Sequence, residues 1–104
     1  MVLEIYKASK QFPREELFAL TSQMRRTSVS ISANIAEGFG RQGIKEKIQF
    51  YYLAPGSLTE LKNHISVARD LFYLDKKVVE EILEQATTAH RLLQGLIRKS
   101  KTFL

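Results

Sequence analysis

Gly38, Gly40 and Gly43 form a G-x-G-x-x-G motif, a spacing that can wrap around the phosphates of a dinucleotide. That chemistry needs a strand before the motif and a helix N-terminus facing the pyrophosphate, as in a βαβ unit. Here a helical pattern precedes Gly38, and no βαβ unit is indicated anywhere in the chain. We therefore interpret the motif as a helix–helix connection, with Arg41 beside the next helix N-terminus as a candidate anion contact.

Histidine, glutamate and serine side chains do not have the spacing of a metal or nucleophilic site. A di-iron site in a helical bundle needs Glu-x-x-His, whereas Glu60 and His64 are four residues apart and Thr87 stands three residues before His90. Both histidines are interpreted as packing residues beside apolar stripes. The serines near position 30 have no histidine base at a fixed spacing, and the chain has no cysteine. The sequence thus predicts a non-enzymatic protein without a metal or cofactor.

Basic side chains are unevenly distributed and give a candidate nucleic-acid surface. The formal net charge is +5 at pH 7. One basic cluster lies within residues 22–49, and a second lies within residues 91–104, which contain no acidic residue. Such clusters can bind phosphates, although cations near a helix C-terminus also complement the helix dipole. The candidate phosphate-binding residues are Arg41, Lys45, Lys47, Arg91, Arg98, Lys99 and Lys101.

Four predicted helices must position these residues, and they form a single domain over residues 1–104. The helices are predicted over residues 2–11, 13–38 and 44–73 and from the N-cap Asp75 onward. Pro13 suits a first helical turn, and Gly38 should end the second helix. Pro55 predicts a kink in the third helix rather than a break, because its apolar stripe stays in phase on both sides. The fold class is all-α, an antiparallel up-and-down four-helix bundle.

The second predicted helix has three faces rather than two. Its core stripe comprises Leu17, Leu20, Met24, Ile31 and Ile35. A polar face carries Gln23, Arg26, Ser30, Asn34 and Glu37. This polar face has two interpretations: it is solvated, or it forms a buried interhelical network in which arginine pairs with glutamate and asparagine fills the remaining hydrogen bonds.

The third face of the same helix is small and apolar and comprises Phe18, Val29, Ala33 and Ala36. A helix packed only inside a monomeric bundle is expected to turn a charged face to water. The third face therefore predicts a second packing surface, contributed by another subunit or, alternatively, by an intramolecular neighbour.

The run FPREELFALTSQMRRTSVSISANIAEGFGR at residues 12–41, followed by LAPGSLTEL at 53–61, resembles the four-helix bundle family encoded in intervening sequences of bacterial 23S rRNA genes. The resemblance implies an up-and-down bundle that assembles as a homopentamer and has no known catalysis. That family is similar to the accessory variability proteins of diversity-generating retroelements, which are basic pentamers that bind nucleic acid. The residues assigned to a polar network or to assembly are Gln23, Arg25, Arg26, Asn34, Glu37 and Glu60. Those assigned to close packing are Phe18, Val29, Ala33, Ala36 and Gly56.

The sequence departs from that family in two places. The first helix is usually longer, whereas this chain begins only a few residues before Ile5 and Tyr6. A helix of about 15 Å cannot cover a second helix of about 37 Å, so we expect a shortened first helix and a partly exposed bundle. Pro55 stands where the family more often has Arg or Lys.

These observations predict a homo-oligomeric helical bundle that serves as an RNA or ribonucleoprotein accessory. The alternative is a protein-interaction scaffold with no nucleic-acid role. Glu4 interrupts any signal-peptide core, and no stretch approaches 18 apolar residues, so a cytoplasmic protein without membrane contact is expected.

Overall fold

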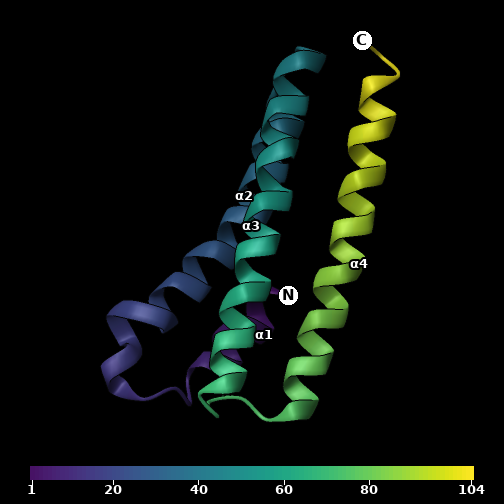
Figure 1. Cartoon of the computed structure of the whole chain (residues 1–104). Helices are drawn as coiled ribbons and strands as arrows, with labels where there is room; N and C mark the ends of the chain where they lie inside the picture. Colours follow the sequence, from purple (N-terminus) through teal and green to yellow (C-terminus); the bar gives the residue numbers. More distant parts are fainter.

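The computed structural model describes residues 1–104 and contains four α-helices and no strand. The helices are α1 (Val2–Ser9), α2 (Ser22–Gly40), α3 (Ile44–Asp70) and α4 (Lys76–Lys101). Successive helices alternate in direction within an elongated molecule of 46 × 24 × 17 Å (Figure 1). The predicted all-α up-and-down bundle with a shortened first helix is confirmed.

The hydrophobic core is centred on α3, which packs against α2 on one side and α4 on the other. The core residues recur at helical spacing, as the sequence predicted. Those of α3 are Ile48, Tyr51, Ala54, Leu58, Leu61, Ile65 and Ala68, and those of α4 include Val79, Ile82, Ala86 and Leu93. Asp75 is the N-cap of α4, because its carboxylate accepts a hydrogen bond of 2.9 Å from the Val78 backbone N–H.

The second helix begins at Ser22, not at Pro13 as predicted, because an irregular segment precedes it. This segment comprises a 3₁₀ turn, η1 (Arg14–Glu16), and a π-helical turn, η2 (Leu17–Thr21), in which Ala19 leaves helical geometry at φ −121° and ψ −105°. A π turn contains extra residues, so the side chains before it rotate out of the stripe that follows. Leu17, predicted to lie in the core, is accordingly 44% exposed, whereas Leu20 and Met24 are buried.

Three other predicted helix ends differ from the structure. The first helix ends at Ser9, with only Ile5 of its apolar residues buried and Leu3 82% exposed. α2 continues past Gly38 to Gly40. α3 passes through Pro55 without a break, as predicted, but it ends at Asp70 rather than at residue 73.

The end of α3 places Phe72 outside both the helix and the core. Phe72 has φ 62° and is 92% exposed, although it lies within the predicted third helix, residues 44–73, and continues the helical spacing of Leu61, Ile65 and Ala68. The Tyr73 N–H donates a hydrogen bond of 2.9 Å to the Ala68 carbonyl, which is the bond of a Schellman turn. That turn requires a left-handed residue after the helix, and Phe72 occupies this position.

Gly38 of α2 lies against the ring of Tyr51 of α3. A Cβ on Gly38 would lie 2.7 Å from Cδ1 of Tyr51 and closer still to Cε1, and Tyr51 is buried. Gly56 was predicted to be a close-packing residue, but a Cβ there would meet no atom within 4 Å. Within the chain, therefore, close packing requires glycine at position 38 and not at position 56.

Because two tyrosines are shielded from water, the stability of the fold is expected to decrease at alkaline pH. Burial raises the pKa of Tyr51 above its ordinary value of 10.0, and burial with the charges of Glu16 and Glu15 raises that of Tyr73. A group whose pKa is higher in the folded protein than in the unfolded chain contributes stability that is fully present below the unfolded pKa, here 10.0. This stability is lost as the pH rises toward the pKa of the group in the folded protein. We expect the thermal unfolding midpoint, followed by circular dichroism, to fall above pH 10, and to fall less in Tyr51→Phe. An identical pH dependence in both proteins would contradict this assignment.

Candidate functional site

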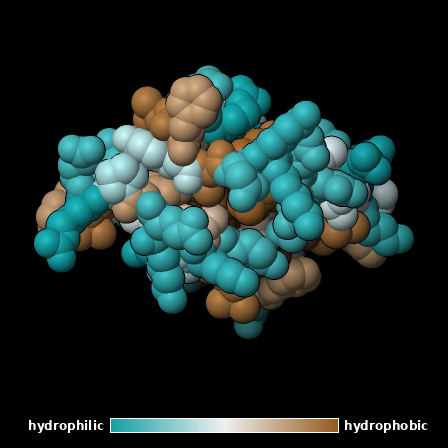
Figure 2. Space-filling view, turned by 90° about the horizontal axis from the view of Figure 1, so that it is seen from below, coloured by the Kyte–Doolittle hydropathy of each residue, from teal (hydrophilic) through white to brown (hydrophobic).

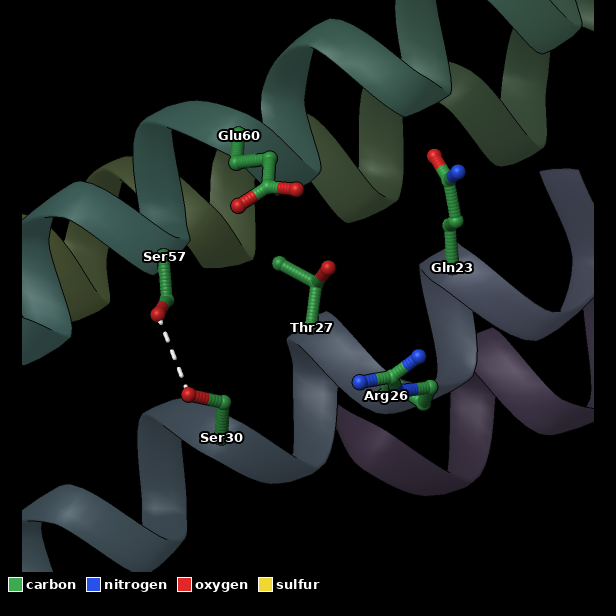
Figure 3. A pocket seen from close by; sticks show the side chains of 6 residues that line it. All are labelled: Gln23, Arg26, Thr27, Ser30, Ser57 and Glu60. Atoms are coloured by element: carbon green, nitrogen blue, oxygen red, sulfur yellow. Dashed lines mark hydrogen bonds between the residues drawn. The ribbon is translucent and has the colours of Figure 1, made fainter.

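A cleft between α2 and α3 is lined only by polar side chains (Figure 3). Its volume is about 360 Å³. The side chains of Ser30 and Ser57 point toward each other across it, and their hydroxyl oxygens are 3.1 Å apart. The remaining lining residues are Gln23, Arg26 and Thr27 of α2 and Glu60 of α3. The polar face predicted on the second helix thus meets α3 along this cleft.

The polar face of α2 is solvated in the single chain, apart from the half-buried Ser30 and Asn34. Arg26 and Glu37 are exposed, and Glu37 pairs with Arg41 at 3.1 Å. Asn34 donates its amide to the carbonyl of Ser30 at 2.9 Å, within its own helix. Within the chain, the interpretation of this face as a buried interhelical network is therefore wrong.

Two further residues assigned to the polar network have separate partners. Arg25 donates from Nε to Oγ of Ser9 at 2.9 Å, and its guanidinium carbon lies 4.9 Å from the Tyr6 ring centroid. These contacts tie α2 to α1. Oε1 of Glu60 lies 3.7 Å from Nε2 of His64, which is buried as expected but leaves Nδ1 without a hydrogen-bond partner.

The apolar face of α2, formed by Val29, Ala33 and Ala36, is exposed, and so is Phe18 of the preceding π turn η2. Phe18, at the irregular start of the helix, is 92% exposed. No other helix of the chain covers this face, so the alternative of an intramolecular neighbour is wrong. Figure 2, which views the molecule from the end that carries the irregular segment, also has hydrophobic side chains between hydrophilic ones.

Parts of the two predicted basic clusters lie at the same end of the molecule, whereas Arg25 and Arg26 lie near the start of α2. The connection from α2 to α3 and the C-terminal end of α4 both lie at the top of Figure 1. We call this region the basic end; its residues are Arg41, Lys45, Lys47, Arg98, Lys99 and Lys101. Arg91 lies about two turns earlier in α4. The predicted up-and-down topology implies this shared end, although the charge pattern alone does not.

The side chains of the α2–α3 connection are partly engaged within the chain. Lys47 donates from Nζ to the carbonyl oxygens of Phe39 at 2.9 Å and Gly38 at 3.3 Å, where the dipole of α2 favours a cation. Arg41 pairs with Glu37 and lies 4.7 Å from the Phe50 ring centroid. These two residues therefore have structural roles beside any ligand contact.

The cations of residues 91–104 form no ion pair within the chain. Instead, Nζ of Lys101 lies 5.0 Å from the ring centroid of Tyr52, and Nζ of Lys99 lies 5.7 Å from that of Phe103. Their charge is consequently free of acidic partners in this chain and available to an anion.

A second cleft, of about 470 Å³, lies between α3 and α4 and has no acidic lining residue. It is lined by Tyr52 and Pro55 of α3 and by His90, Gln94, Ile97, Arg98 and Lys101 of α4. Sequence analysis missed Tyr52 and Gln94. The spacing from 90 to 94, 98 and 101 does place the α4 residues on one helix face, but only the fold brings Tyr52 opposite them.

No group of three histidine, aspartate or glutamate side chains lies close enough to hold a metal ion. None of the helices combines the length and apolar character that crossing a membrane requires.

The family model described as 23S rRNA-intervening sequence protein matches residues 1–95. A comparison with curated proteins found no match. The matched residues include the polar cleft and the apolar face of α2, whereas Arg98, Lys99 and Lys101 lie beyond them.

Proposed function

The chain belongs to the 23S rRNA-intervening sequence protein family, and from this premise we propose that it is a homo-oligomeric, non-enzymatic accessory that binds RNA or DNA. The single observation that carries the proposal is the basic end, where cations of the α2–α3 connection and of residues 91–104 lie together with few acids. Their role is to contact phosphates irrespective of base sequence. The proposal includes no catalytic step and no cofactor, and it assigns the protein to the cytoplasm, where RNA is abundant.

Self-association is the second part of the proposal, and the exposed apolar face of α2 supports it. Small residues such as Ala33 and Ala36 allow a neighbouring helix to approach closely. Five copies are the number that the resemblance to the family implies, and the same resemblance extends to the accessory proteins of diversity-generating retroelements. Repeating the basic end around a symmetry axis would turn a modest charge into a strong local field.

Binding across a salt series tests the phosphate contacts. The purified, nuclease-treated full chain is titrated with a structured RNA and with a matched duplex DNA. We expect the logarithm of the affinity to fall linearly with the logarithm of salt concentration for both ligands, because phosphate contacts release counterions. Arg98→Ala combined with Lys101→Ala should reduce the slope by about 2.

A matched control for that variant is Lys76→Ala combined with Lys77→Ala, which removes the same charge from the opposite end of α4. The control should retain most of the salt slope. An equal reduction of the salt slope in both variants would mean that net charge, rather than the basic end, drives binding.

A protein-interaction scaffold is the second candidate function, and the same exposed apolar face favours it. Phe18 is a large side chain with almost no cover from its own chain. Absence of nucleic-acid binding even at low salt would reject the accessory role and leave the scaffold.

A further inference from the structure

We propose that the cleft between α3 and α4 binds a single-stranded segment of nucleic acid and stacks a base on Tyr52. This inference rests on the proposed function and deepens it, because it specifies the strand form and the recognised group. Nucleic-acid binding through the basic end does not by itself require an aromatic side chain. The evidence for base binding is therefore the set of side chains that line the cleft around Tyr52.

Tyr52 is an exposed aromatic residue that lines the cleft. Its side chain is 50% exposed, and it lines the cleft together with Lys101. Nζ of Lys101 lies over the ring, 5.0 Å from the centroid. Both residues line one cavity, so a ligand that displaces Lys101 would meet the ring face beneath it.

The other lining residues supply what a nucleotide needs around its base. Arg98 and Lys101 provide two cations for the flanking phosphates, with no acidic side chain among the lining residues. The Gln94 amide can both donate to and accept from a base edge. The cleft volume of about 470 Å³ falls within the range of small-molecule sites, which suits one nucleotide.

Stacking favours a single strand because duplex bases have both faces covered by their neighbours. An unpaired base has a free face, and aromatic side chains bind such bases with little sequence preference. Stacking of a base on an aromatic ring is stronger than an exposed cation–π contact, so a base can replace Lys101 over the ring. The displaced ammonium then remains within reach of the adjacent phosphate. The electrostatic contacts at the basic end therefore act together with the aromatic platform.

Fluorescence anisotropy with the full chain tests the inference. The probes are a short unstructured RNA, the same strand annealed to its complement, and the DNA strand of the same sequence. We expect the single strands to bind more tightly than the duplex. Tyr52→Ala should weaken single-strand binding about tenfold while leaving duplex binding and the salt slope unchanged.

Three further variants separate stacking from packing. Tyr52→Phe keeps the ring and should bind as the parent does. Tyr52→Leu keeps an apolar side chain without an aromatic face and should bind as Tyr52→Ala does, which covers the case in which the alanine variant folds poorly. Leu53→Ala removes an exposed apolar neighbour on α3 and should leave binding unchanged.

The result that overturns the inference is duplex binding as tight as single-strand binding, or equal single-strand affinity in the parent and Tyr52→Leu. Either outcome leaves the proposed function intact if the salt dependence persists. Absence of salt-dependent binding to every probe would instead reject both.

Discussion

Gly38→Ala is expected to destabilise the protein by about 1 kcal/mol. The new Cβ would meet the Tyr51 ring at distances that real Cβ atoms do not adopt, and Tyr51 is buried between α2 and α3. Overpacking of this kind costs about 1–3 kcal/mol and exceeds the helix-propensity gain of about 1 kcal/mol from removing a glycine. Urea denaturation followed by circular dichroism measures the change.

Gly56→Ala is the matched control, because Gly56 also lies within a helix but has open space where its Cβ would be placed. Here only the propensity gain remains, so stability should rise by up to about 1 kcal/mol. Opposite signs in the two variants would establish that Gly38 is required by contact with Tyr51. A stabilised Gly38→Ala protein would contradict this packing argument.

Ala33→Glu is expected to break the proposed oligomer into monomers. The substitution places a carboxylate on the exposed apolar face of α2, where a subunit contact would bury it without a partner. Such a charge costs several kcal/mol, enough to dissociate most self-associating surfaces. Light scattering coupled to gel filtration measures the mass of the particle.

Thr87→Glu is the control for this experiment, since it adds the same charge at an exposed position of α4 away from that face. Its mass should equal that of the parent protein. An Ala33→Glu protein of parental mass would show that the apolar face of α2 is not a subunit contact.

The sequence predicted the regular parts of the fold well because their apolar periods are unambiguous. Asp75 as a cap and the stripe from Val79 to Leu93 follow directly from helical spacing and capping preference. The predicted start of the second helix was wrong for a physical reason. Pro13 is compatible with a first helical turn, but the π turn around Ala19 inserts residues that no periodicity argument detects.

The candidate site was only partly predictable. The basic residues and the faces of α2 could be read from composition and helical spacing, and Phe18 and Ala33 are exposed as a second packing surface would require. The environment of Tyr52 could not be predicted from the sequence. Its cleft combines residues about forty positions apart, and only the antiparallel packing of α3 and α4 brings them together. Gly38 was likewise interpreted as a helix end, when its main role is contact with Tyr51.

The uneven placement of charge gives the molecule an electric dipole along its long axis. At the end opposite the basic end, cations such as Arg14, Arg69, Lys76 and Lys77 alternate with acids such as Glu15, Glu16, Asp70 and Asp75. In the field of a polyanion, such a particle experiences a torque that turns its positive end forward before any contact forms. Association would then begin in a nearly correct orientation, so that the rate of encounter depends on ionic strength more steeply than the rate of escape.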